Sequence, residues 1–128
     1  MADTIAFELV SPERLLLAKP VEMVVVPGTE GNFGVLPGHA PLISTVRPGV
    51  IDIYEGGKVT EQIFVAGGFA EVTGERCTVL AERAMPVEDI DRAAVEKKLR
   101  DDREDGNAAE VEIGEAMLAA LEAGATRH

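Results

Sequence analysis

Few side chains in this sequence could act as a nucleophile, an acid or a base, and the two that stand out are His39 and Cys77. A cysteine beside a histidine can form a nucleophilic pair, in which the imidazole takes up the thiol proton. Strand alternation, however, places Cys77 on one face with Val79 and Ala81, where a thiol packs as a small hydrophobic side chain. We expect His39 to lie in a loop, holding a neighbouring carbonyl or contacting a partner.

Phosphate-binding and metal-binding patterns are incomplete. The segment 56–59, Gly-Gly-Lys-Val, lacks the spacing and the hydroxyl of a P-loop. Four residues fit part of a calcium loop: Asp101, Asp105, Gly106 and Glu112. Arg103 stands at the third ligand position of that loop, and a guanidinium cannot bind a cation. We therefore expect no metal site, no cofactor and a charged surface turn around Gly106.

The charge balance argues against two classes of partner. The 128 residues carry 23 acidic and 12 basic side chains, a net charge of −11, which repels nucleic acid and anionic lipid headgroups.

The chain begins without a basic and apolar leader, and its longest uncharged stretch, 31–46, is shorter than the roughly 20 apolar residues of a spanning helix. We expect no targeting segment and no direct lipid insertion. The single cysteine excludes an intrachain disulfide.

The composition changes near Pro86. Ten of the 13 glycines precede it, and all seven prolines lie at or before it. Apolar residues alternate with polar ones around 5–9, 51–55, 63–65 and 77–82, which is typical of strands. We interpret Gly56-Gly57, Gly67-Gly68 and the segment 73–76 as hairpin turns. This pattern predicts an antiparallel β-sandwich or barrel over residues 1–86.

Residues 87–128 are predicted to form a helical hairpin. An apolar stripe through Ile90, Val95 and Leu99 predicts the first helix, with Glu88 and Asp89 in its first turn. The segment 105–107, Asp-Gly-Asn, should end it. The second helix has one apolar face, made by Ala109, Ile113, Ala116, Met117, Ala120 and Leu121. Because many of these side chains are small, we expect a marginal hairpin that could detach from the sheet.

One run of residues resembles a known family. The pattern Glu-Gly-x-x-Gly-x-x-Pro-Gly-His-Ala-Pro-Leu occupies residues 30–42, and matching segments lie at 7–13, 48–49, 67–72 and 78–82. Together they resemble the epsilon subunit of the bacterial-type rotary ATP synthase over residues 4 to 95. The resemblance implies an N-terminal antiparallel β-sandwich followed by a C-terminal two-helix hairpin, and a non-catalytic rotor subunit.

In that family the sandwich packs on the gamma shaft and on the polar loops of the membrane c-ring, and couples proton-driven ring rotation to the catalytic head. The resemblance implies a peripheral position at the cytoplasmic face of the bacterial inner membrane, and transient contact of the hairpin with catalytic beta subunits. It also suggests contact residues. The ring-facing loop would be Glu30, Gly31, Asn32 and Phe33, His39 would lie near the shaft or ring, and Ser11 and Ser44 would lie on the shaft face.

Two departures from the family pattern limit what carries over. Asn32 stands where the family often has an acid. Relatives that bind ATP on the hairpin use an Ile/Leu-Asp-x-x-Arg-Ala motif, and here Ile90 and Asp91 are followed by Ala94 at the arginine position. We therefore expect neither ATP sensing nor strong inhibition by the hairpin. The alternative to a rotor subunit is a small cytosolic β-sandwich that binds or transforms a ligand through His39.

Overall fold

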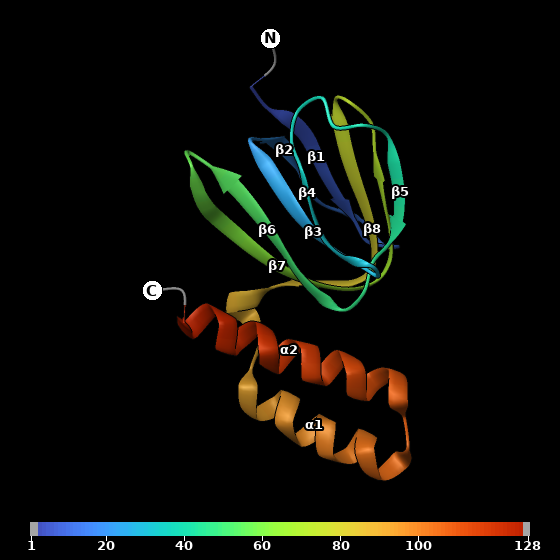
Figure 1. Cartoon of the computed structure of the whole chain (residues 1–128). Coiled ribbons are helices and arrows are strands. Elements are labelled where there is room, and N and C mark those ends of the chain that lie inside the picture. The colour runs from blue at the N-terminus through green and yellow to red at the C-terminus, as the bar shows by residue number, and fades with distance from the viewer. Residues whose placement is uncertain (1–2, 127–128) are drawn as a thin grey trace.

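The computed structural model describes residues 3–126, so His128 and the Arg127 side chain lie outside the described residues. A β-sandwich stands above two helices, as Figure 1 shows. The elements are β1 (Ile5–Val10), β2 (Leu15–Val21), β3 (Met23–Gly28), β4 (Gly31–Val35), β5 (Leu42–Thr45), β6 (Gly49–Glu55), β7 (Lys58–Val72), β8 (Arg76–Pro86), the 3-10 turn η1 (Val87–Asp89), α1 (Arg92–Asp105) and α2 (Ala108–Thr126). The predicted order of a sandwich followed by a helical hairpin is confirmed.

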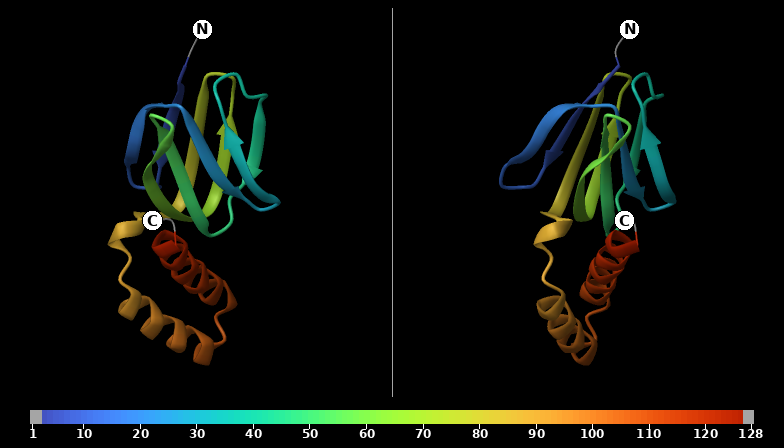
Figure 2. Two further views of the ribbon diagram at one scale, coloured as in Figure 1. Left: turned by 60° about the vertical axis from the view of Figure 1, so that its left-hand side comes forward. Right: turned by 90° about the vertical axis from the view of Figure 1, so that its left-hand side faces the viewer.

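The strands pair in the order β2-β1-β8-β7-β6-β3-β4, and β5 pairs with β7 outside this path. Only β1 and β8 run parallel among these pairs. The long strand β7 belongs to both layers, because its first half pairs with β6 and its second half with β5. Figure 2 shows how the two layers splay apart along one edge. On the opposite edge a bridge between Gly28 and Val46 joins the layers.

The interpretation of Gly67-Gly68 as a hairpin turn is wrong. Both glycines lie inside β7, with φ of 75° and 101°, and the register between β7 and β8 continues past them. A Cβ added to Gly68 would lie 1.8 Å from the carbonyl oxygen of Leu80. The pair therefore bends β7 where it changes partner from β6 to β5, and only glycine can take this conformation so close to β8.

The core lies between the layers and follows the predicted alternation. Ile5, Phe7 and Leu9 of β1 are buried, and so are Ile51 and Ile53 of β6. Pro20 lies in the edge strand β2, where its missing N–H breaks no ladder inside the sheet. These buried side chains form one continuous cluster with those of β3, β7 and β8, which stabilises the sandwich through removal of apolar area from water.

The first helix begins later than predicted. Glu88 and Asp89 belong to η1, and α1 starts at Arg92. The reason is Asp91, whose carboxylate accepts hydrogen bonds from the backbone N–H groups of Ala93 (3.1 Å) and Ala94 (3.3 Å) and so caps the helix. The predicted end is confirmed, because Gly106 adopts a left-handed conformation with φ 69° directly after α1.

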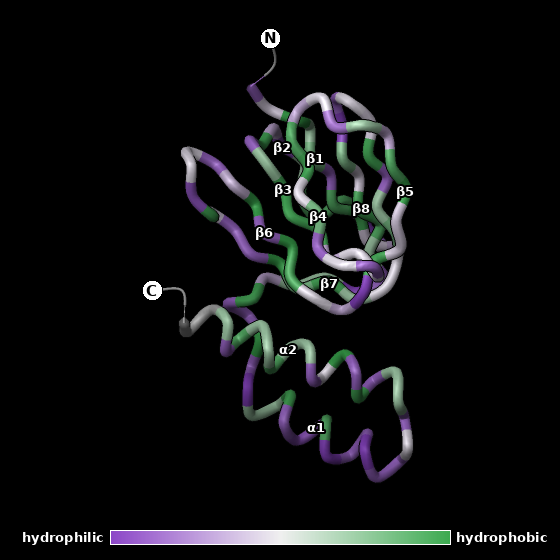
Figure 3. The backbone as a smooth tube through the Cα atoms, in the orientation of Figure 1, coloured by the Kyte–Doolittle hydropathy of each residue, from purple (hydrophilic) through white to green (hydrophobic). Residues whose placement is uncertain are grey.

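The helical hairpin packs on the sheet through α2. Figure 3 shows that α1 is mostly hydrophilic, whereas α2 carries more hydrophobic residues. A second buried cluster combines Phe64 and Ala66 of β7 with Ile90 and Ala120, and the predicted apolar face of α2 packs against it. Ala109 is an exception, because it is exposed at the start of α2.

A group of charged side chains ties the hairpin to the sandwich, and no pattern in the sequence predicted it. Arg83 of β8 donates two hydrogen bonds to the Glu110 carboxylate of α2, of 2.9 and 2.7 Å. Lys98 of α1 pairs with the same carboxylate over 2.9 Å and with Asp102 over 2.7 Å. We call these four residues the hairpin clamp. It connects three elements that are separated in the sequence.

Candidate functional site

His39 lies in the loop between β4 and β5 and serves that loop's structure. Its Nδ1 donates to the carbonyl oxygen of Ala40 over 2.6 Å, and its backbone N–H donates to Leu36 over 3.0 Å. The neighbouring Gly38 donates to the carbonyl oxygen of Gly74 over 2.8 Å, which ties the loop to the turn before β8. The half-buried loop histidine that holds a neighbouring carbonyl is the arrangement observed.

Cys77 cannot act as a partner for His39. Its side chain is fully buried in the core, and burial raises the pKa of the thiol to about 12, so the nucleophilic thiolate is not formed near neutral pH. The hypothesis of a His39–Cys77 nucleophile is therefore wrong.

Within residues 3–126, no three acidic, histidine or cysteine side chains gather in a way that could hold a metal ion.

The predicted ring-facing loop is mostly a strand. Only Thr29 and Glu30 form the turn between β3 and β4, and Asn32 and Phe33 are residues of β4. Phe33 is half-buried, pairs with Val26 and packs on the main core. Its ring lies so close to Gly28 that a Cβ there would be 2.9 Å from Phe33 Cε1. Phe33 is thus anchored inward, and Glu30 is the side chain that projects from the turn.

The seven sequence-predicted residues fall into separate regions. Glu30, Gly31, Asn32 and Phe33 lie at the turn end of β4, whereas His39 follows the other end of that strand. Ser11 lies in the turn after β1, where its hydroxyl accepts from the backbone N–H of Arg14 over 3.3 Å. Ser44 in β5 pairs with the buried Ala70, so its neighbours Ile43 and Thr45 point to the outer face.

An apolar stripe crosses the outer face of the layer that contains β1, β5 and β8. Phe69 and Leu80 are cross-strand partners, and Leu80 in turn lies beside Val10, whose partner is Leu15. Ile43 of β5 lies diagonally beside Phe69 and is 70% exposed. We call these five residues the outer-face stripe.

A contiguous apolar patch on a surface marks a site of protein contact. The sequence carried a signal for it, since Phe69 and Leu80 are large apolar residues in the outward phase of strands whose buried phase is already apolar. That signal points to an interface only once the strands are known to be neighbours.

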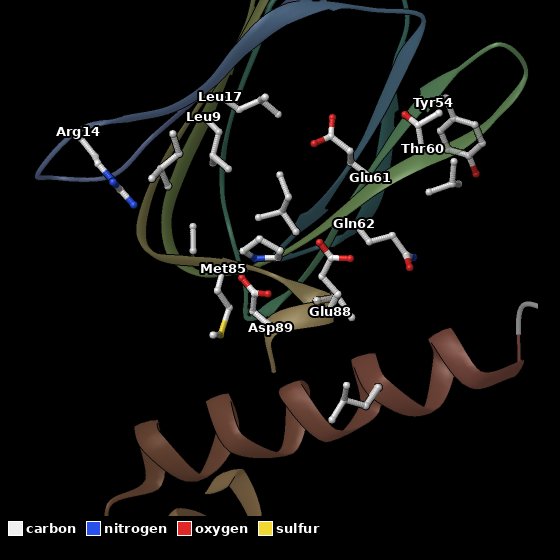
Figure 4. A pocket seen from close by; sticks show the side chains of 17 residues that line it. Leu9, Arg14, Leu17, Tyr54, Thr60, Glu61, Gln62, Met85, Glu88 and Asp89 are labelled. Carbon is white, nitrogen blue, oxygen red and sulfur yellow. The ribbon is translucent and has the colours of Figure 1, made fainter. Parts of the chain in front are cut away.

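A cleft of about 1290 Å³ opens on the edge of the sandwich opposite the Gly28–Val46 bridge. Its walls come from β2 on one side and the β6–β7 hairpin on the other, and η1 and α2 lie below it, as Figure 4 shows. Leu9, Leu17 and Met85 line it with apolar surface, and Glu88 and Asp89 lie at its rim. Among the described residues that line the cleft there is no histidine, cysteine or serine, and the hydroxyl of Thr60 donates to the Glu55 carboxylate.

Lys19 of β2 spans this open edge. Its ammonium pairs with Glu55 of β6 over 3.0 Å and with Glu61 of β7. These hydrogen bonds, that to Glu61 most of all, raise the pKa of Lys19. At this edge no strands pair across the two layers, so these ion pairs connect the layers there.

Comparison with known proteins assigns the fold to a family. The sequence model of the ATP synthase delta/epsilon chain β-sandwich domain matches residues 4–87. The ATP synthase epsilon chain of Rhodospirillum rubrum is 60% identical over 121 residues, which are 93% of this chain and 90% of the relative. That of Paramagnetospirillum magneticum is 53% identical over 132 residues, covering 94% of this chain and 99% of the relative.

Solved structures extend the similarity to the helices. A chain of the Euglena gracilis mitochondrial ATP synthase, in an assembly of OSCP, F1 and c-ring, superposes with a TM-score of 0.84 and 29% identity over 94% of this chain and 83% of that one. A chain from the central stalk and c-ring of the Tetrahymena thermophila enzyme shares the fold, with a TM-score of 0.56 and 12% identity over 66% of this chain and 68% of that one.

No helix within residues 3–126 is long and apolar enough to cross a membrane. The residues matched by the family model, 4–87, include the turn after β3, the loop with His39 and the outer-face stripe. The superposition with the Euglena chain covers 94% of this chain and so includes the helical hairpin as well as the sandwich. This chain belongs to the ATP synthase delta/epsilon chain family.

Proposed function

We propose that this chain couples the rotor of an ATP synthase, by holding the gamma shaft with the outer face of its sandwich and the polar loops of the c-ring with the turn after β3. The chain is a non-catalytic accessory subunit of the synthase. The observation that carries the proposal is that two surfaces of different chemistry, the outer-face stripe and the turn after β3, lie on separate parts of one sandwich. A subunit that transmits rotation between two partners needs two such surfaces.

The outer-face stripe suits a permanent partner. Interfaces of stable complexes bury contiguous apolar surface, with large side chains at their centre. Ile43, Phe69 and Leu80 are 70%, 44% and 39% exposed in the chain by itself, so their burial on a shaft would remove apolar area from water. Ser11 and His39 lie in segments around this layer and would supply polar contacts at its rim, whereas Ser44 lies on the inner face beside Ala70.

The turn after β3 suits a polar partner. Glu30 is exposed at its tip, and Gly31 lets the backbone approach a partner closely. Asn32 and Phe33 follow in β4 and hold the turn to the sheet rather than reaching out from it. A carboxylate on an exposed turn can bond to the polar loops of a ring without inserting into lipid. The net charge of −11 disfavours insertion among anionic lipid headgroups.

We also propose where the chain acts and which of its two parts makes which contacts. The chain would act as a peripheral subunit at the cytoplasmic face of the bacterial inner membrane. Residues 1–86 would carry the coupling contacts, and the hairpin, residues 87–128, would touch the catalytic beta subunits only transiently. Support comes from the position of the stripe and the turn, both of which lie before Pro86.

The test is retention of the chain by the purified synthase. Ile43→Lys places a charge at the most exposed position of the stripe, so the fold should keep its stability to within about 0.5 kcal/mol while the shaft contact is lost. Ala119→Lys, at an exposed position of α2, is the matched control. We expect Ile43→Lys to deplete the chain from the complex and Ala119→Lys to leave it there. Equal retention of both variants would contradict the proposed shaft contact.

A further inference from the structure

The turn between β3 and β4 has its positive φ at Gly31, after the two loop residues. Hairpin loops of two residues favour turns in which a loop residue has a positive φ, because that twist matches the twist of the strands. Among the described residues only glycines have positive φ, so Thr29 and Glu30 do not, and Gly31 carries the unusual angle of 132° instead. The hairpin therefore differs from the favoured two-residue loop, and contacts from elsewhere in the chain hold it as well.

Those contacts come from the end of β5 and from the segment that follows it. The backbone N–H of Thr29 donates to the carbonyl oxygen of Thr45 over 3.1 Å, and the two threonine hydroxyls lie 2.8 Å apart. The backbone N–H of Arg47 donates to the carbonyl oxygen of Pro27 over 2.9 Å. The turn is thus joined on one side to a segment that lies about 20 residues away in the sequence.

The side chain of Arg47 completes the connection. One guanidinium nitrogen, Nη1, donates to the carbonyl oxygen of Gly28, the last residue of β3. The other, Nη2, donates to Oδ1 of Asn32 in β4 over 2.6 Å. A single planar group therefore bonds to both strands of the hairpin, and its fork geometry fixes the separation of the two strands.

The charges at this end of the sandwich are arranged unusually. Both acceptors of Arg47 are neutral oxygens, and Glu30 has no side-chain partner among the described residues. The guanidinium of Arg47 is therefore not paired with a carboxylate, although it lies in the same hairpin as Glu30. Arg47 thus holds the turn by hydrogen bonds without neutralising Glu30.

We propose that Arg47 is the positioning residue of the ring-facing turn: it fixes the hairpin so that Glu30 meets the polar loops of the c-ring with its charge intact. This inference rests on the proposed function, because it assigns the turn to the ring. Without Arg47 the turn would explore other shapes, and ordering Glu30 on the ring would cost conformational entropy.

The experiment uses a synthase depleted of this subunit and reconstituted with the whole chain or its variants. The measured quantity is the chain concentration that restores half of the ATP-driven proton pumping. For Arg47→Gln we expect this concentration to rise about tenfold, the effect of losing a charge-assisted pair of hydrogen bonds. Arg100→Gln, which removes an exposed arginine from α1, is the matched control and should change nothing.

A double-mutant cycle separates positioning from general destabilisation. If Arg47 acts through Glu30, then Arg47→Gln should weaken binding in the natural chain and add little in a Glu30→Gln background. The melting temperature of the isolated chain should fall by the same amount in both backgrounds. Arg47→Lys should weaken binding nearly as much as Arg47→Gln, because an ammonium lacks the planar fork that bonds to both strands of the hairpin.

The outcomes distinguish the two proposals. If Glu30→Gln leaves the half-restoring concentration unchanged, the ring contact of the proposed function is wrong, and the inference on Arg47 is wrong with it. If Glu30→Gln weakens binding but Arg47→Gln does not, only the positioning role is overturned. It is also overturned if the effects of Arg47→Gln and Glu30→Gln simply multiply, since Arg47 would then act independently of the turn.

Discussion

The hairpin clamp should decide how firmly the helices stay on the sandwich, and Glu110→Gln is the change that tests it. The Glu110 carboxylate accepts from Arg83 and Lys98, and its side chain is only 17% exposed. The hydrogen bonds from Arg83, then those from Lys98, lower the pKa of Glu110 to about 2. The glutamine keeps the shape of the side chain and removes its charge, so it isolates the electrostatic part of the contact.

The free energy that Glu110→Gln removes from hairpin docking lies between two limits. Ion pairs on a surface contribute about 0.2–1 kcal/mol, and hydrogen bonds to a charged group in a sheltered site about 1.5–3 kcal/mol. Arg83 is 52% exposed, so solvent screens its attraction, but its contact with Glu110 is bidentate. We therefore expect Glu110→Gln to destabilise the docked hairpin by about 1–2 kcal/mol.

Hydrogen exchange measures this quantity directly, because it reports the opening of each part of the chain separately. A loss of about 1–2 kcal/mol corresponds to a roughly 5- to 30-fold loss of protection in α2, with the core strands β1 and β8 unchanged. Glu115→Gln is the control, since Glu115 is 58% exposed and has one contact, of 3.2 Å, with Arg103. Equal loss of protection in the two variants would refute a special role of the clamp.

The same clamp predicts the direction of a pH effect. A carboxylate whose pKa is lowered by folding stabilises the folded state above its unfolded pKa, and loses that contribution as the pH falls through the folded value. For Glu110 the ordinary pKa is 4.5 and the folded one about 2. The difference in α2 protection between the natural chain and Glu110→Gln should therefore be constant above pH 4.5 and decrease between pH 4.5 and 2.

Three further outcomes are expected. Phe33→Ala should lower the stability of the isolated chain by about 2–4 kcal/mol, because the ring packs on the core and on Gly28, and thermal unfolding would show it; a variant as stable as the natural chain would place the ring outside the core. Gly68→Ala should prevent the native pairing of β7 with β8, since its Cβ would lie 1.8 Å from a carbonyl oxygen, and a circular dichroism spectrum identical to that of the natural chain would contradict this. Calorimetry with Mg-ATP should detect no sub-millimolar binding, because residues 87–128 carry 6 basic and 12 acidic side chains, a net charge of −6, and Ala94 replaces the arginine of the family motif; measurable heat of binding would refute this expectation.

Local patterns were sufficient for the strands and for the identity of the core. Alternation in Ile5, Phe7 and Leu9, and in Cys77 and Val79, predicted which side chains are buried, because the period of a strand is fixed by backbone geometry. In the same way the apolar period of α2 and the glycine at 106 predicted a helix face and a helix end. The family pattern at residues 30–42 identified the class of protein.

The contacts that give these elements their roles were decided by the tertiary structure. Gly56-Gly57 and Gly67-Gly68 have the same residue types in the sequence. Gly56-Gly57 forms the turn between β6 and β7, whereas Gly67-Gly68 lies beside β8 and forms a bend inside β7. The start of α1 depended on whether Asp91 or the acids before it would cap the helix. In each case two local solutions were available, and packing selected one.

The surfaces proposed for function depend on the register of distant strands. Phe69 and Leu80 become an interface only because β7 and β8 pair them, and Arg47 reaches Asn32 only because the segment after β5 crosses beside the β3–β4 hairpin. Arg83 and Glu110 meet because the chain folds back after Pro86. The sequence by itself determined which residues are apolar, charged or free to turn; the tertiary structure decided which of them meet, because contacts between distant segments depend on the strand register and layer packing of the whole chain.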